Sequence, residues 1–210
     1  MNLSLEQPII YLITKGEATE SNFAVKRREI LEIIRTAVDE RISLVQLREK
    51  NLRARLIFEL ACEAADLVRR SDTRLLINDR ADIALAAKAD GVHLTSTSLP
   101  IGDIRAHFPD DFMVGASTHT LAETVDAAGG RADFAVFGPV FDSPGKGSPH
   151  GIDVLAKVCS ELKPFPIIAL GGIDGANCQA ALEAGAAGFA AIRWLNDAAS
   201  LRSISSRLIK

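Results

Sequence analysis

Short apolar runs alternate along the chain with longer segments in which apolar residues recur every three or four positions. The short runs predict buried strands and the longer segments predict amphipathic helices, an alternation typical of βαβ units with a parallel sheet. Helical spacing is clearest at Lys26–Asp39 and Arg53–Arg69. The expected strands are Ile9–Thr14, Leu44–Arg48, Leu75–Asn78, Gly91–Leu94, Met113–Ser117, Phe134–Gly138, Ile167–Gly171 and Gly188–Arg193.

Eight strand–helix pairs are the number that closes a (β/α)8 barrel, although an open doubly wound sheet gives a similar pattern. Two features favour the barrel. The loop after the first strand lacks a Gly-x-Gly-x-x-Gly motif, and polar or glycine-rich segments follow nearly every strand, where barrels carry their sites. We therefore predict an α/β protein, a single (β/α)8 TIM barrel, with residues 1–210 forming one domain.

Composition and charge exclude several classes of partner. The chain is 48% hydrophobic and 24% charged with a net charge of -3, and its Lys and Arg residues are scattered, so we expect no nucleic-acid or membrane partner. Its three widely spaced cysteines fit neither a disulfide framework nor a metal site. Without a signal peptide or membrane-spanning segment, the expected location is cytoplasmic. The sequence leaves open whether the chain forms a homo-oligomer.

Basic and amide side chains follow the second expected strand. Alternation along Val45–Lys50 places Gln46, Arg48 and Lys50 on one side of the strand. One interpretation is a solvated strand end. The other is that the cations face inward and bind an anion, because a buried unpaired charge is costly. We favour the anion, since Arg and Lys are the usual phosphate-binding side chains.

An amide and a carboxylate, Asn78 and Asp79, follow the third expected strand. Either side chain is suited to cap the next helix. Beside the basic end of the preceding strand, however, oxygen ligands are also suited to hold Mg²⁺ against a diphosphate. This combination makes Asp79 a candidate magnesium ligand.

Glycine-rich segments follow the later strands. Gly171 and Gly172 either bring backbone N–H groups to an anion at the start of the next helix or form a plain turn. Arg193, at the end of the eighth strand, adds a cation where barrels commonly bind phosphate. The loop at residues 137–148, which contains Ser143 and Lys146, is either a flexible lid or an exposed linker.

Two histidines and a serine complete the candidate residues. Ser117, after the fifth strand, could donate to a ligand. His119 either caps the next helix or performs acid–base chemistry, and we favour a structural role for it. His93, within the fourth strand, is interpreted as an interior histidine with its hydrogen bonds satisfied.

These segments, in this order, resemble the thiamine phosphate synthase and thiazole tautomerase family from Tyr11 to about Leu195. The resemblance implies a transferase that joins a hydroxymethylpyrimidine diphosphate to a thiazole phosphate in thiamine biosynthesis, with magnesium assistance and release of pyrophosphate. The matching segments are Val45–Lys50, Leu76–Arg80, Asp90–Leu94, Gly115–His119, Phe137–Phe141 and Gly171–Ile173.

The resemblance also implies individual roles. The catalytic residues would be Arg48, Lys50, Ser117 and Lys146. They would contact the diphosphate and the leaving group. Substrate binding would involve Gln46, Asn78, Ser143, Gly171, Gly172 and Arg193, and Asp79 would bind magnesium.

The chain departs from the family's pattern at four positions, one of which is Gly145, where a small hydroxyl residue is common. Ser98 stands where synthases carry a second magnesium-binding Asp, and Arg193 stands where they carry a phosphate-binding Ser. Pro139 occupies the place of a catalytic His in the tautomerase branch. Two alternatives therefore stay open: a tautomerase-like isomerase using His119 or another acid–base group, and a barrel that binds a phosphorylated ligand without catalysis.

Overall fold

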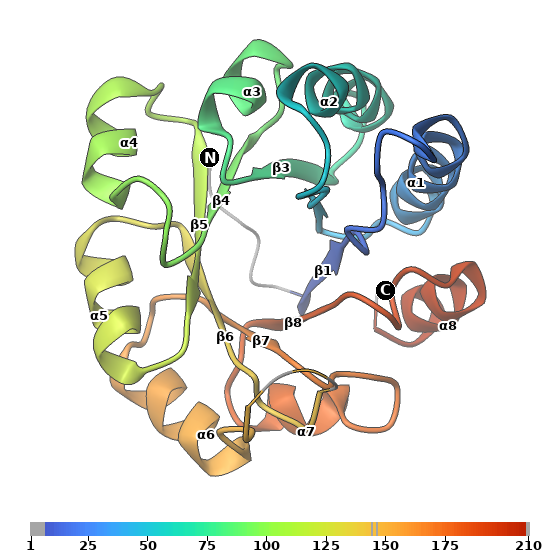
Figure 1. Ribbon diagram of the computed structural model, residues 1–210. Helices are drawn as coiled ribbons and strands as arrows, with labels where there is room; N and C mark the ends of the chain where they lie inside the picture. Colours follow the sequence, from blue (N-terminus) through green and yellow to red (C-terminus); the bar gives the residue numbers. More distant parts are fainter. Residues whose placement is uncertain (1–6, 144, 146, 209–210) are drawn as a thin grey trace. The chain divides into compact units, whose positions relative to one another are not determined.

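The computed structural model describes residues 7–143, 145 and 147–208, and it describes side chains in the last helix as far as Ile204. Within these residues, strands and helices alternate along the whole chain (Figure 1). The strands pair in chain order, from β1 to β8, into a closed barrel. The predicted (β/α)8 barrel is therefore confirmed.

The strands are short and their residues are almost all buried, as expected for parallel strands that are covered on both faces. They are β1 (Ile9–Ile13), β2 (Leu44–Leu47), β3 (Arg74–Asn78), β4 (Gly91–Leu94), β5 (Met113–Thr118), β6 (Phe134–Phe137), β7 (Ile167–Leu170) and β8 (Gly188–Ala191). The helices are α1 (Phe23–Asp39), α2 (Ala54–Val68), α3 (Ala81–Ala86), α4 (Ile101–His107), α5 (Leu121–Gly129), α6 (Ile152–Glu161), α7 (Cys178–Glu183) and α8 (Ala198–Leu208).

Every expected strand is present, with small shifts at the ends. The largest difference is at β8, which ends at Ala191 rather than at Arg193 because the chain enters a turn at Ile192. Arg193 therefore lies in this turn rather than on the strand. The helix predicted at Lys26–Asp39 begins earlier, at Phe23.

Internal contacts divide the chain into two compact units. The β1–β3 unit consists of the described residues 11–92 and 192–208. The β5–β8 unit consists of the described residues 7–10 and 93–191. Each unit is described by itself, and the expectation of one domain over residues 1–210 stays a prediction.

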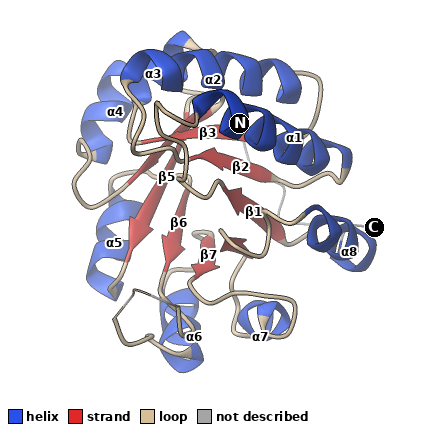
Figure 2. Cartoon of the chain, turned by 45° about the vertical axis from the view of Figure 1, so that its right-hand side comes forward, coloured by secondary structure: helices blue, strands red, loops and turns tan. Residues whose placement is uncertain are grey.

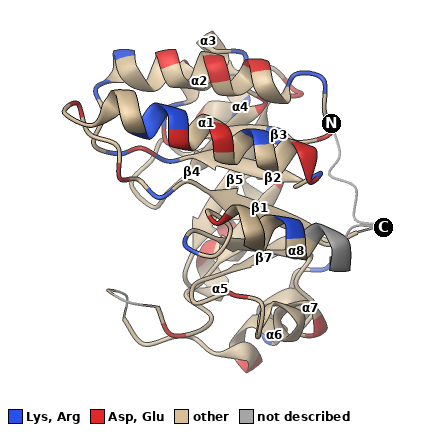
Figure 3. Ribbon diagram, turned by 90° about the vertical axis from the view of Figure 1, so that its right-hand side faces the viewer, with Lys and Arg blue, Asp and Glu red and all other residues tan. Residues whose placement is uncertain are grey.

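In the β1–β3 unit, α1 and α2 pack side by side. Each helix turns an apolar stripe inward; in α2 the stripe includes the buried residues Leu60, Ala61 and Ala64. Charged residues of both signs lie along the same two helices (Figure 3). Arg27 and Glu63 form an ion pair between them at 2.7 Å. Because such exposed pairs contribute little, the apolar stripes hold the helices in place.

In the β5–β8 unit, β5, β6, β7 and β8 are neighbours in register, and α5 packs against β5 and β6 (Figure 2). Arg105 of α4 adds a polar tie. Its Nη2 donates to Asp133 Oδ2 at 2.7 Å and its Nη1 donates to the carbonyl oxygen of Phe112, also at 2.7 Å. The Arg105 side chain is only 12% exposed, so these hydrogen bonds satisfy a charge that is largely withdrawn from water.

Cys62, Cys159 and Cys178 are free cysteines. Burial raises the pKa of the Cys159 thiol to about 11. In the part of the chain that the structure describes, no helix combines the length and the apolar character needed to span a membrane.

Gly188, the first residue of β8, allows a close backbone approach inside the β5–β8 unit. A Cβ atom added there would lie 1.9 Å from the carbonyl oxygen of Ile9. Gly102, in α4, has open space where a Cβ would project, with nothing within 4 Å. The two glycines therefore serve as a crowded site and an open site for the same substitution.

Replacing Gly188 with Ala is expected to lower the free energy of unfolding by about 2 kcal/mol or more, because the added methyl group displaces strand backbone. Gly102→Ala is expected to raise it by about 0.5–1 kcal/mol, since Ala is the better helix former and restricts the unfolded chain. Urea unfolding followed by circular dichroism measures both changes. Equal stability of the two variants would contradict the close approach at Gly188.

Candidate functional site

Gln46 and Asn78 meet at the ends of neighbouring strands in the β1–β3 unit. Gln46 Nε2 donates to Asn78 Oδ1 at 2.9 Å. The strand register pairs Gln46 with Leu76, so Asn78 lies one strand pleat further along β3. Gln46 is only 2% exposed, and the hydrogen bond therefore supplies a partner for a buried amide. The structure brings these two predicted substrate-binding residues together.

Arg48 and Lys50 lie beyond the last residue of β2. The strand β2 ends at Leu47, and beyond it Arg48 is half-buried while Lys50 is exposed. The expectation that Lys50 continues the face of Gln46 and Arg48 stays a prediction, because the ladder that enforces alternation has ended. Neither cation forms an ion pair with another described residue. A half-buried guanidinium that forms no ion pair with a described residue is suited to bind an anionic ligand.

Asp79 has a left-handed backbone, with φ of 62°. The N-cap position of α3 is Arg80, which makes no side-chain capping hydrogen bond, so the capping alternative for Asn78 or Asp79 is wrong. Instead Asn78 Nδ2 lies 3.5 Å from Asp79 Oδ2, and the Asp79 side chain is exposed. An amide and a solvent-accessible carboxylate therefore stand side by side at the end of β3.

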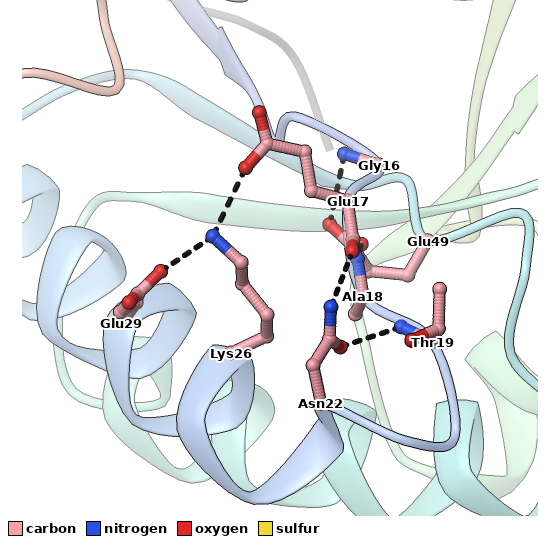
Figure 4. Close-up of polar contacts among 8 residues, drawn as sticks. All are labelled: Gly16, Glu17, Ala18, Thr19, Asn22, Lys26, Glu29 and Glu49. Atoms are coloured by element: carbon pink, nitrogen blue, oxygen red, sulfur yellow. Dashed lines mark hydrogen bonds and ion pairs between the residues drawn. The ribbon is translucent and has the colours of Figure 1, made fainter.

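Glu49 is a buried carboxylate that the sequence pattern did not reveal. It is 4% exposed. Its Oε1 accepts the N–H of Gly16 at 3.2 Å, and its Oε2 accepts the N–H of Ala18 at 2.9 Å (Figure 4). One signal was available: strand alternation puts Glu49 with Val45 and Leu47, and a carboxylate on an apolar side must find buried donors.

The loop after β1 is also fastened to α1 (Figure 4). Lys26 Nζ lies 3.0 Å from Glu17 and 2.8 Å from Glu29. The hydrogen bond to Glu29, followed by that to Glu17, raises the pKa of Lys26, and the hydrogen bond from Lys26 lowers the pKa of Glu17. A cavity of about 220 Å³, lined in part by Lys15 and Glu49, lies beside this loop.

In the β5–β8 unit, Ser117 is held by a buried histidine. His93 is 2% exposed, and its Nε2 lies 2.9 Å from Ser117 Oγ. The imidazole is tilted against the Phe134 ring, with 6.2 Å between ring centroids. The interpretation of His93 as an interior histidine with a partner agrees with this geometry, which also fixes the hydroxyl of a candidate catalytic residue.

His119 links the ends of two strands. Its Nδ1 forms a hydrogen bond with the carbonyl oxygen of Gly138, so this ring nitrogen acts as the donor. The N-cap of α5 is Thr120, whose Oγ1 accepts the N–H of Glu123 at 3.2 Å. The capping alternative for the His119 side chain is therefore wrong, and its role here is to tie the end of β5 to the loop after β6.

Gly171 and Gly172 have left-handed backbones, with φ of 99° and 64°. A Cβ on Gly171 would lie 2.6 Å from Pro139, and a Cβ on Gly172 would lie 2.4 Å from the carbonyl oxygen of Asp142. The helix α7 begins only at Cys178. The glycines therefore lie apart from the start of α7, and binding of an anion by their N–H groups stays a prediction. Close packing against the loop after β6 is sufficient reason for glycine at both positions.

The remaining candidates divide between the two units. Ser143 is half-buried in the loop after β6, whereas Lys146 lies outside the described residues. Arg193 is exposed in the β1–β3 unit, and its association with Gly171 and Gly172 stays a prediction. Ser98 Oγ accepts the N–H of Thr95 at 2.6 Å, which makes Ser98 a turn-forming residue of its own loop.

The chain is similar to several known proteins over most of its length. The family model described as thiamine monophosphate synthase matches residues 10–195. A protein of Geobacter sulfurreducens is 45% identical over 79% of this chain and 78% of its own length. The thiamine-phosphate synthase of Syntrophomonas wolfei is 35% identical over 95% of this chain and 93% of its own length. The solved thiamine phosphate pyrophosphorylase of Pyrococcus furiosus superimposes with a TM-score of 0.81 at 27% identity, covering 98% of this chain and 99% of that one.

Removal of the Asn78 side chain tests the buried amide pair. Asn78→Ala is expected to lower the free energy of unfolding by about 1–2 kcal/mol, because Gln46 Nε2 keeps its burial and loses its acceptor. Asn78→Asp, which retains an acceptor oxygen, is expected to lose less. Urea unfolding of both variants checks the difference. An unchanged midpoint in the alanine variant would show that the hydrogen bond does not contribute to stability.

Proposed function

Because the chain belongs to the thiamine monophosphate synthase family, we propose that it joins a hydroxymethylpyrimidine diphosphate to a thiazole phosphate and releases pyrophosphate. It is an enzyme of the diphosphorylase type, a transferase of thiamine biosynthesis on a (β/α)8 barrel. The observation that carries the proposal is the Arg48 guanidinium, half-buried and without an ion pair to any described residue. Such a group binds an oxyanion at little desolvation cost, since its own desolvation accompanies folding.

The proposed reaction is a substitution at the methylene carbon of the pyrimidine. The bond between this carbon and the diphosphate oxygen breaks, and its electron pair leaves with the pyrophosphate. The lone pair of the thiazole nitrogen forms the new carbon–nitrogen bond. Negative charge therefore grows on the leaving group in the transition state, which is where fixed cations and donors accelerate the reaction.

In this proposal the β1–β3 unit supplies the groups for the diphosphate. Arg48 and Lys50 stabilise its charge, and the hydrogen-bonded amides of Gln46 and Asn78 hold its oxygens. Because Gln46 is buried and already paired, it contributes orientation rather than charge.

The β5–β8 unit supplies the groups for the leaving group and the second substrate. The Ser117 hydroxyl, held by His93, donates to the departing pyrophosphate. Lys146, outside the described residues, has the same assignment. The thiazole phosphate is assigned to the segment of Gly171 and Gly172 with Ser143. Arg193 keeps its expected assignment to substrate binding.

Magnesium forms part of the proposal. No group of three or more His, Cys, Asp or Glu side chains that could hold a metal occurs among the described residues. The exposed Asp79 carboxylate beside the Asn78 amide nevertheless fits Mg²⁺, which takes few protein ligands and completes its shell with phosphate and water oxygens. Asp79 would hold the ion, and the ion when bound would neutralise diphosphate charge.

The two alternative functions receive no specific support. Pro139 has no proton to transfer, and the His119 Nδ1 is engaged with the carbonyl oxygen of Gly138. The cations at the end of β2 would serve a binding-only barrel equally well, so they give that alternative no specific support. For location we propose the cytoplasm, which agrees with the free thiols of Cys62, Cys159 and Cys178.

The proposal is tested by incubating the full chain with both substrates and Mg²⁺ and measuring thiamine phosphate and pyrophosphate. Arg48→Ala is expected to lower kcat/KM by about 100-fold, as loss of a charge-stabilising donor does. Arg27→Ala, which removes an exposed Arg paired with Glu63, is the matched control and should change kcat/KM by less than about twofold. Absence of product with the wild-type chain would refute the synthase function, and full activity of Arg48→Ala would refute the role of Arg48.

Ser98→Asp tests whether a second carboxylate assists magnesium. The variant is expected to need a lower Mg²⁺ concentration for half-maximal activity, because a carboxylate is a far better ligand than a hydroxyl. The turn itself should survive, since Asp also accepts the N–H of Thr95. Ser98→Asn is the uncharged control of the same size. Identical Mg²⁺ titrations for the three proteins would show that Asp79 and the substrate oxygens suffice.

A further inference from the structure

The loop between β1 and α1 depends on a carboxylate that comes from the end of β2. Glu49 accepts the N–H of Gly16 with one oxygen and the N–H of Ala18 with the other, at 3.2 and 2.9 Å (Figure 4). Both donors belong to the same short loop. A single side chain therefore fixes the loop at two points.

The guanidinium of Arg48 lies over this loop. Gly16 has φ of 76°, and a Cβ placed on it would be 3.0 Å from Arg48 Nη1 and 3.1 Å from the carbonyl oxygen of Arg48. The absence of a side chain at Gly16 thus makes room for both the main chain and the charged head of Arg48. Any movement of Gly16 changes the surface against which the guanidinium rests.

Thr14, at the start of the loop between β1 and α1, also forms hydrogen bonds with the main chain at the end of β2. The N–H of Thr14 donates to the carbonyl oxygen of Gln46 at 3.0 Å, and the N–H of Arg48 donates to Thr14 Oγ1 at 2.8 Å. Thr14 is fully buried. The Arg48 backbone is therefore anchored through Thr14, whereas the contact of its side chain depends on Gly16 and hence on Glu49.

The other ties of this loop are weaker. Lys26 pairs with Glu17 on the surface, where the Glu17 side chain is 53% exposed. Exposed pairs of this kind contribute little, whereas charge-assisted hydrogen bonds donated to a buried carboxylate are strong. Their removal leaves two amide donors without acceptors. Glu49 is therefore the principal restraint on Gly16 and Ala18 among the contacts described.

We propose that Glu49 is a positioning residue for diphosphate binding: by holding Gly16 and Ala18, it fixes the surface that orients the Arg48 guanidinium. The inference rests on the proposed function, in which Arg48 binds the diphosphate, and it adds a residue that does not touch substrate. Loss of Glu49 should weaken binding of the diphosphate and leave binding of the thiazole phosphate unchanged.

The first experiment measures binding of inorganic pyrophosphate with Mg²⁺ to the full chain by calorimetry. Glu49→Gln, which keeps the shape but presents an NH2 group to one amide, is expected to raise the Kd about tenfold, corresponding to about 1.4 kcal/mol. In the steady state, the KM for the pyrimidine diphosphate should rise while that for the thiazole phosphate does not. Glu17→Gln, the same change on the same loop at an exposed ion pair, should leave both unchanged.

Two further variants separate failure of this inference from failure of the proposed function. If the wild-type chain does not bind pyrophosphate, or if Arg48→Ala binds it as tightly as wild type, the proposed function fails. If Arg48→Ala loses binding while Glu49→Gln keeps it, only the present inference is overturned. Glu49→Gln should cause no additional loss in an Arg48→Ala background, because its effect passes through Arg48. Additive losses would show that Glu49 acts by another route.

Gly16→Ala keeps the inference testable if Glu49→Gln fails to fold. The added methyl group leaves the Glu49 carboxylate intact and presses on Arg48 from the loop side, with additional strain from the positive φ. Its pyrophosphate Kd should also rise about tenfold. Wild-type binding by a folded Gly16→Ala protein would overturn the dependence of Arg48 on this loop.

Discussion

A charged side chain that is withdrawn from water needs a hydrogen-bonding or oppositely charged partner. The ends of β2 and β3 are organised around this requirement. Next to one another in the chain, Arg48 and Glu49 meet it in opposite ways. The carboxylate is compensated internally by two loop amides. The guanidinium has no ion-pair partner among the described residues and is compensated by a ligand in the proposed function. In the proposed function, one inward charge thus serves the fold and the other binds the substrate.

The fold was readily predicted because strands of a parallel barrel are buried on both faces. They appear in the sequence as continuous apolar runs, such as the one at Phe134–Phe137, separated by helical periodicity. The ends were less certain, as at β8, because a strand ends where its neighbours stop pairing. A single segment of sequence does not contain that information.

The sequence supplied the candidate residues of the site, whose roles stay predictions, but not their local geometry. Strand alternation, side-chain chemistry and the family resemblance selected Gln46 and Asn78, which the structure joins by a hydrogen bond. Glu49 and Lys50 lie beyond the last paired residue of β2, where the ladder no longer fixes the direction of a side chain. The packing of Gly171 against Pro139 joins chain segments distant in sequence, so no local pattern could have revealed it.

The contact between His93 and Ser117 links the protonation of the imidazole to the direction in which the serine hydroxyl donates its hydrogen bond. A neutral imidazole has one protonated and one bare nitrogen. When Nε2 carries the proton, it donates to Ser117 Oγ, and the serine hydrogen remains available for an anion. When Nε2 is bare, the serine donates to the ring and presents only lone pairs, which repel an anion. The tautomer of a buried ring thus sets the polarity that the hydroxyl presents, and this choice is made out of reach of solvent.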